Sequence, residues 1–190
     1  MDFIKDEEFI RGKCPMTKED VRTLSIVKMN LKDNSMVLDV GSGSGSITVQ
    51  AAKIAKEGKV LALEKEDEAY EITQSNVQKF KCDNVKIIKE EASKILDILI
   101  SEELKFDSVF IGGSSGHLEE ILLKVNAILN ENGTIVMNFI TLDNVYRAIE
   151  IIKNLNYKFE ISLINISRNR KDTLMMIANN PIFIIQCMKN

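Results

Sequence analysis

The sequence predicts a doubly wound α/β fold, in which a seven-stranded, mostly parallel sheet carries helices on both faces and ends in an antiparallel hairpin strand. Three observations lead to this expectation. Short β-branched runs alternate with helical patterns, a glycine-rich turn joins the first of these runs to a helix, and no helix separates the last two runs. Such alternation produces βαβ units, and their parallel strands are covered by helices on both sides.

The elements follow one another in a regular order. A helix that ends at about Lys28 comes first, because Thr17 is a suitable N-cap and acidic residues occupy the turn after it. Parallel strands are then expected at residues 36–40, 60–64, 85–89, 108–112 and 134–139. The helices that connect and follow them are expected at residues 47–56, 67–80, 93–104, 118–129 and 144–155.

The last two strands, expected at residues 158–166 and 181–188, depart from this alternation. A polar segment at 167–172 and a short apolar run connect them. Two successive strands without a crossover pair antiparallel. The final strand therefore distinguishes this sheet from the all-parallel dinucleotide-binding fold.

Composition limits the class of protein. The 190 residues, 45% of them hydrophobic and 28% charged, predict one globular domain over residues 1–190. A net charge of −3 argues against a general nucleic-acid surface, and no apolar run is long enough to span a bilayer. The three cysteines are widely spaced and form no zinc pattern. We therefore expect a cytoplasmic protein without a metal site and without a membrane or nucleic-acid partner.

The most informative motif is the turn after the first strand, where Asp39 precedes glycines at alternate positions. Glycines let a ligand lie against bare backbone, and the helix that follows offers unpaired N–H groups. The G-x-G-x-G spacing differs from the dinucleotide fingerprint, and the absence of Gly-Lys-Ser/Thr excludes a P-loop. The motif resembles that of class I methyltransferases, which bind S-adenosylmethionine. This resemblance implies cofactor contacts at Gly41, Ser42, Gly43, Ser44 and Gly45.

Acidic residues at the ends of the second and third strands extend this interpretation. Glu64 ends the second strand, and a carboxylate there can accept hydrogen bonds from both ribose hydroxyls. The same spacing suits NAD, so Glu64 alone does not identify the cofactor. In methyltransferases the end of the third strand contacts adenine, which implies roles for Glu91 and Ala92. The alternative is a solvated acidic cluster that caps the next helix at Ser93.

The segment after the fourth strand is rich in glycine and poor in side chains. We expect Gly112 to contact the cofactor, and Gly113 and Ser114 to form a wall that a bulky substrate approaches. An Asn/Asp-Pro-Pro-Tyr/Phe motif, which would indicate methylation of an amino group, is absent. His117 is the only histidine and therefore a candidate general base, but an exposed polar residue at a helix start is the simpler interpretation.

Positive charge is concentrated between the two terminal strands, at Arg168 and Arg170. Guanidinium groups pair bidentately with carboxylates, so these residues are candidates for binding a polycarboxylate substrate, and Arg11 and Lys13 could join them. The alternative interpretation is a solvated charged surface.

Five segments in chain order resemble the decarboxylating cobalt-precorrin-6B C15-methyltransferases of anaerobic cobalamin biosynthesis. These segments are 6–10, 15–22, 39–46, 112–116 and 165–168. The resemblance implies methylation of carbon 15 of a tetrapyrrole, with loss of carbon dioxide from the acetate on carbon 12, and a homotetramer. It also implies a cofactor contact at Thr17 and an N-terminal segment, 1–30, that covers the site. The family does not fix the position of His117.

Two other functions stay open from the sequence. A transfer-RNA adenine methyltransferase has similar motifs, but such enzymes usually carry an N-terminal barrel and a basic surface. A non-catalytic module that binds a nucleotide-type cofactor is the second alternative, and an oxidoreductase subunit of this kind conflicts with the glycine spacing and the terminal hairpin.

Overall fold

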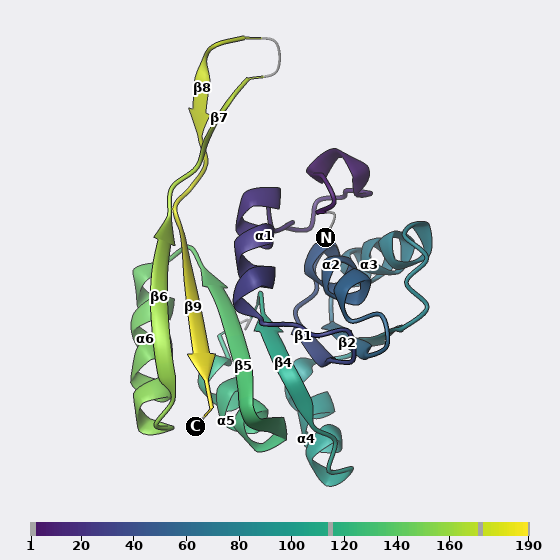
Figure 1. Cartoon of the computed structure of the whole chain (residues 1–190), viewed down its shortest axis with the longest axis vertical. Coiled ribbons are helices and arrows are strands. Elements are labelled where there is room, and N and C mark those ends of the chain that lie inside the picture. Colours follow the sequence, from purple (N-terminus) through teal and green to yellow (C-terminus); the bar gives the residue numbers. More distant parts are fainter. Residues whose placement is uncertain (1–2, 114–115, 171–172, 190) are drawn as a thin grey trace.

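The computed structural model describes residues 3–113, 116–170 and 173–189. Its main sheet has seven strands in the order β3-β2-β1-β4-β5-β9-β6 (Figure 1). The strands are β1 (Met36–Val40), β2 (Lys59–Glu64), β3 (Val85–Lys89), β4 (Phe106–Ile111), β5 (Leu129–Phe139), β6 (Lys158–Ile164) and β9 (Ile182–Met188). The first five pair in parallel, and β9 lies antiparallel between β5 and β6. The predicted architecture is therefore confirmed.

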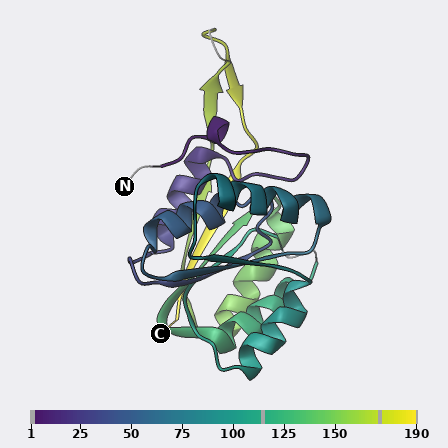
Figure 2. The same ribbon diagram turned by 90° about the vertical axis from the view of Figure 1, so that its right-hand side faces the viewer.

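Helices cover both faces of this sheet (Figure 2). They are α1 (Glu19–Lys28), α2 (Ser46–Ile54), α3 (Asp67–Lys79), α4 (Ala92–Ser101), α5 (Leu118–Ile128) and α6 (Leu142–Asn154), and a short 3-10 helix, η1 (Asp6–Glu8), precedes them. None of the helices in the described residues is long and apolar enough to cross a membrane.

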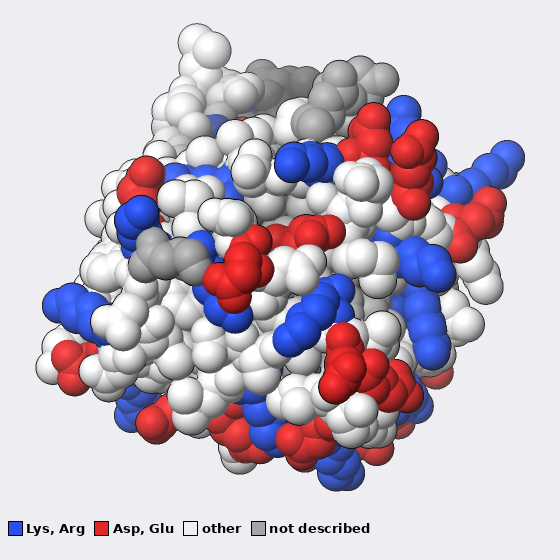
Figure 3. Space-filling view, turned by 60° about the horizontal axis from the view of Figure 1, so that its bottom comes forward, with Lys and Arg blue, Asp and Glu red and all other residues white. Residues whose placement is uncertain are grey.

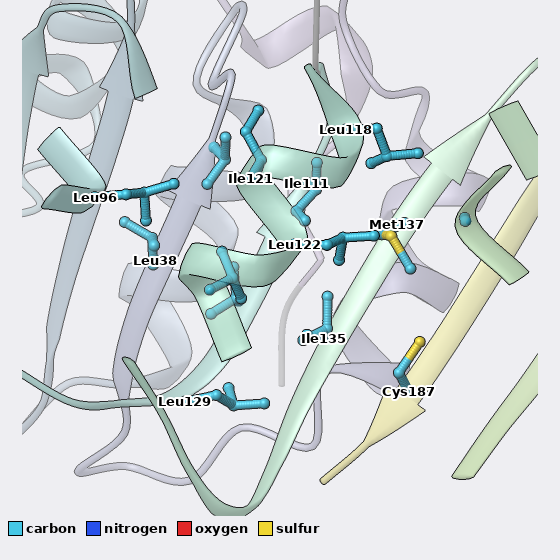
Figure 4. Packing of buried hydrophobic residues seen from close by; sticks show 14 of the residues in the cluster. Leu38, Leu96, Ile111, Leu118, Ile121, Leu122, Leu129, Ile135, Met137 and Cys187 are labelled. Carbon is cyan, nitrogen blue, oxygen red and sulfur yellow. The ribbon is translucent and has the colours of Figure 1, made fainter. Parts of the chain in front are cut away.

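Alternating side chains divide the core into two layers. On β5, Ile135 and Met137 join the cluster beneath α4, α5 and α6, whereas Val136 joins the cluster beneath α1 and α2. The same alternation occurs on β9, where Cys187 belongs to the first cluster and Ile184 to the second (Figure 4). Because successive residues of a strand point to opposite faces, these runs of apolar residues bury both faces of the sheet.

Two local predictions are wrong. The N-cap of α1 is Lys18 and makes no side-chain capping hydrogen bond, so Thr17 does not cap the helix. The carbonyl oxygen of Thr17 instead accepts a hydrogen bond from the guanidinium of Arg22 at 2.7 Å. The connection after β6 also contains two short strands, β7 (Ser167–Asn169) and β8 (Met176–Ala178), which pair antiparallel. This ribbon extends away from the sheet at its carboxyl end (Figure 1).

Candidate functional site

The turn between β1 and α2 has a backbone that only glycine adopts without strain. Gly41, Gly43 and Gly45 have φ angles of 75°, 58° and 74°, in the left-handed region. The chain also approaches this turn closely. A Cβ atom on Gly41 would lie 3.0 Å from the backbone nitrogen of Gly113, and one on Gly43 would lie 2.9 Å from the carbonyl oxygen of Pro15. Steric crowding and conformation therefore both require the glycines that the sequence displays.

Hydrogen bonds from two other elements hold the turn. The N–H of Gly43 donates to Glu64 Oε2 at 2.8 Å, and the hydroxyl of Thr73 donates to the carbonyl of Gly43 at 2.9 Å. The amide of Asn76 donates to the carbonyl of Ser44 at 2.8 Å. Thr73 and Asn76 are fully buried on α3 and were not predicted as site residues. Two polar residues on the buried face of an amphipathic helix are the sequence signal that points to them.

Glu64 lies at the carboxyl end of β2, where the sequence places it, and is only 8% exposed. Its second oxygen, Oε1, accepts hydrogen bonds from the backbone N–H groups of Lys65 at 2.8 Å and Glu66 at 3.0 Å. Three backbone donors thus fix the orientation of this carboxylate. It shapes the glycine turn in addition to facing the cavity.

Asp39 is buried directly before the glycine turn. Its Oδ2 accepts a hydrogen bond from the hydroxyl of Thr48 at 2.5 Å, whereas its Oδ1 has no partner among the described residues. Burial raises the pKa of Asp39 to about 7, against the lowering effect of the Thr48 hydrogen bond and with a smaller contribution from the negative charge of Glu64.

A cavity of about 710 Å³ opens at the carboxyl ends of the strands. Of the residues predicted for the site, those that line it are Thr17, Gly41, Ser42, Gly43, Glu64, Glu91, Ala92, Gly112, Gly113 and His117. Ser44 and Gly45 do not line the cavity, and Ser114 lies outside the described residues. Lys13, one of the basic residues considered for the substrate, also lines the cavity, and so do Cys14 and Pro15, which were not predicted as site residues.

The predicted arginines, Arg11, Arg168 and Arg170, do not line this cavity. Arg168 forms an ion pair with Asp20 of α1, in which Nε and Nη2 lie 2.8 and 2.6 Å from the same carboxylate oxygen. Arg11 lies 3.7 Å from a carboxylate oxygen of Asp6. Within the described part of the chain, no carboxylate lies within ion-pair distance of Arg170.

His117 is the N-cap residue of α5, and although it lines the cavity its side chain is 59% exposed. Its Nδ1 lies 3.8 Å from a carboxylate oxygen of Glu120. This agrees with the simpler interpretation of His117 as a polar residue at a helix start.

Comparison with known proteins decides the family. Residues 8–177 match the model of a precorrin methyltransferase domain. The chain belongs to the precorrin methyltransferase family. It is 44% identical over 186 residues to a probable cobalt-precorrin-6B C(15)-methyltransferase (decarboxylating) of Sulfurisphaera tokodaii, and the alignment covers 96% of this chain and 95% of the relative.

Solved structures of the precorrin methyltransferase family agree with this fold. A precorrin-6y C5,15-methyltransferase from Geobacter metallireducens matches with a TM-score of 0.92 and 34% identity, over 99% of this chain and 97% of the other. A precorrin 8W decarboxylase from Methanobacterium thermoautotrophicum matches with a TM-score of 0.89 and 30% identity, over 97% of this chain and 98% of the other.

Replacement of Asp39 by Asn should change how stability depends on pH. The folded protein keeps a proton on Asp39 up to about pH 7, whereas the unfolded chain releases it near the ordinary value of 3.8. The contribution of Asp39 to wild-type stability should therefore fall as pH rises from 3.8 to about 7, whereas Asp39→Asn has no such pH-dependent contribution. The free energy of unfolding of Asp39→Asn, relative to wild type, should rise with pH by at most about 1.4 kcal/mol per unit and level off above about pH 7.

Chemical denaturation at several pH values measures this difference. Asp33→Asn, which removes an exposed carboxylate, is the matched control and should show no such trend. A difference between Asp39→Asn and wild type that does not vary between pH 4 and pH 7 would contradict the raised pKa.

Proposed function

We propose that this chain is an S-adenosylmethionine-dependent methyltransferase of anaerobic cobalamin biosynthesis. It methylates carbon 15 of cobalt-precorrin-6B and removes carbon dioxide from the acetate on carbon 12. The observation that supports this most strongly is the left-handed glycine turn with the Glu64 carboxylate at the cavity. The chain that carries it is 44% identical to a relative named for this reaction.

The residues present at the cavity fit S-adenosylmethionine. The glycine turn offers backbone without side chains. The carboxylate of Glu64 accepts three backbone donors, and the remaining lone pair, on Oε2, is available for a ribose hydroxyl. Ala92 is the first residue of α4, so its N–H has no acceptor within the helix and its methyl side chain leaves room for adenine. The residues proposed to contact the cofactor are Thr17, Gly41, Ser42, Gly43, Glu64, Glu91, Ala92 and Gly112. Ser44 and Gly45 are no longer among them, because they do not line the cavity.

The cofactor, when bound, supplies a methyl group on a sulfonium, which is already an activated electrophile. The chain then has to orient the two reactants and exclude water. Gly112 and Gly113 keep the wall after β4 bare, and a Cβ atom on Gly113 would meet nothing within 4 Å. The conjugated ring of the substrate is itself the nucleophile, so no strong base is required.

We propose that the substrate carboxylates contact Arg11, Arg168 and Arg170, and that Gly113 and Ser114 border the macrocycle. Arg168 is already paired with Asp20, so a substrate carboxylate would have to share or displace that partner. Arg170 forms no such ion pair within the described chain.

Replacement of Arg170 by Ala should increase the KM for the precorrin without changing the affinity for S-adenosylmethionine. An unchanged KM would remove Arg170 from the substrate site.

The net charge of −3 and the mixed charges on one face favour this substrate over a transfer RNA. On the face shown in Figure 3, lysine and arginine side chains alternate with aspartate and glutamate, and the described residues form no continuous basic surface there. Nucleic-acid binding requires clustered positive charge.

The ribbon and the edge of the sheet support the proposed homotetramer. Leu174, Met176 and Ile177 are 97%, 59% and 48% exposed, and Leu163 on the edge strand β6 is 50% exposed. Exposed apolar surface beside an open sheet edge favours association between copies.

Replacement of Leu174 by Asp should reduce the size of the assembly, because it places a charge within this apolar surface. Light scattering after gel filtration measures the mass. Leu123→Asp, at a 50% exposed position on α5, is the control for an added charge elsewhere. A monomeric wild type would refute the tetramer, and a tetrameric Leu174→Asp variant would remove the ribbon from its interface.

Replacement of Glu64 by Ala should weaken binding of S-adenosylmethionine at least about tenfold, because hydrogen bonds to a charged group contribute about 1.5–3 kcal/mol each. Calorimetric titration measures this affinity, and titration with NAD in parallel tests the rival cofactor. Glu71→Ala, which removes an exposed carboxylate from α3, should bind as wild type does. Unchanged affinity in folded Glu64→Ala, or preferential binding of NAD, would overturn the cofactor assignment.

A further inference from the structure

The N-terminal segment lies along one face of α3, and the two run in opposite directions. Contacts between them recur at each turn of the helix. In chain order they join the Glu8 carbonyl to Lys79 Nζ at 2.5 Å, the Phe9 ring to that of Phe80 with centroids 5.0 Å apart, Ile10 to Asn76, and the Lys13 N–H to Glu68 Oε1 at 2.7 Å. Gly12 fits within this series because a Cβ atom there would overlap Ile72. Helix α3 is thus the surface on which residues 8–13 are seated.

The seated segment leads directly into the wall of the cavity. Lys13, Cys14, Pro15 and Thr17 line it, whereas residues 8–12 do not. Pro15 in this wall lies close to the glycine turn, because a Cβ atom on Gly43 would lie 2.9 Å from the carbonyl oxygen of Pro15. Any displacement of residues 8–13 along α3 therefore changes the wall of the cavity opposite the glycine turn.

Among the described residues of α3, Asn76 alone has a side chain that hydrogen-bonds both to the N-terminal segment and to the glycine turn. Its Oδ1 accepts from the N–H of Ile10 at 2.8 Å, and its Nδ2 donates to the carbonyl of Ile10 at 2.9 Å. The second hydrogen of Nδ2 is used by the carbonyl of Ser44 at 2.8 Å. The Asn76 amide thereby exchanges two hydrogen bonds with the backbone of Ile10, as a residue of a neighbouring strand would. The same nitrogen also donates to the glycine turn.

The other anchors act on only one of the two structures. Thr73 bonds to the turn at Gly43, and Lys79 bonds to the segment at Glu8. Asn76 is fully buried, so water cannot replace a partner that leaves. A movement of Ile10 or of Ser44 would leave part of the buried Asn76 amide without a hydrogen-bond partner. Because this is unfavourable, the positions of Ile10 and Ser44 depend on each other.

We propose that Asn76 is a positioning residue that couples the N-terminal segment to the glycine turn, so that cofactor binding at the turn also stabilises residues 8–13 on α3. The inference rests on the proposed function in that the cofactor is S-adenosylmethionine. It does not depend on the identity of the methyl acceptor. The coupling thereby holds the wall that follows residues 8–13 in place when the cofactor is bound.

Hydrogen exchange with and without saturating S-adenosylmethionine tests this coupling. The informative peptide covers residues 4–12, which do not line the cavity. In the wild type, the cofactor should slow exchange in this peptide as well as in the glycine turn. In Asn76→Ala, the effect on residues 4–12 should disappear, while the turn is still protected at saturation and the affinity for S-adenosylmethionine falls about tenfold.

Three variants separate this role from a loss of stability. Ser75→Ala removes an exposed hydroxyl that bonds only to the carbonyl of Glu71, and it should behave as wild type. Lys79→Met loosens the segment alone, so exchange at residues 4–12 should rise while the affinity changes little. Asn76→Ser leaves a smaller cavity than Asn76→Ala and a hydroxyl too short to reach both partners, and it should show the same loss of coupling if Asn76→Ala does not fold.

The outcomes distinguish this proposal from the proposed function. An unchanged effect of the cofactor on residues 4–12 in the Asn76 variants would overturn the coupling, as would the absence of that effect in the wild type. Normal coupling without methylation of a precorrin would contradict the proposed substrate and leave the coupling intact. A wild type that does not bind S-adenosylmethionine would overturn both.

Discussion

Close packing around the turn at residues 41–45 determines how the rest of the site is built. Its glycines adopt left-handed angles, and the chain after β4 and the N-terminal segment approach two of them so closely that side chains would collide. A left-handed residue other than glycine costs roughly 1–2 kcal/mol, and the crowding adds to that. The turn therefore presents bare backbone to the cavity.

Hydrogen bonds from buried polar side chains hold the backbone of the turn in place. Glu64 accepts the Gly43 N–H, Thr73 and Asn76 donate to the turn's carbonyls, and Asp39 is buried before it. A site held by so many buried hydrogen bonds is organised before a ligand arrives, which reduces the cost of binding. The parallel strands bring the parts of the site together, because the carboxyl ends of β1, β2, β3 and β4 lie at the same end of the sheet.

The sequence predicted the parts of the fold that depend on local patterns. The strands at 36–40 and 85–89 were predicted with the observed bounds, because β-branched runs are visible in the chain. The antiparallel pairing of the final strand was also predicted, because no crossover helix precedes it. The β7–β8 ribbon was missed because all its residues are exposed and show no buried periodicity. Asn76 and the Arg168–Asp20 pair were missed because their partners lie far away in the sequence. Such contacts follow from topology, which local patterns do not reveal.

The central claim is that this cavity brings an activated methyl group to a precorrin whose acetate is then lost. Incubation of the purified chain with cobalt-precorrin-6B and S-adenosylmethionine that carries an isotopically labelled methyl group tests it most directly, with mass spectrometry of the tetrapyrrole. The account predicts a product that has gained one labelled methyl group and lost one carbon dioxide, with label at carbon 15. Transfer of label to RNA in place of the tetrapyrrole, or an unchanged tetrapyrrole in the presence of bound cofactor, would contradict it.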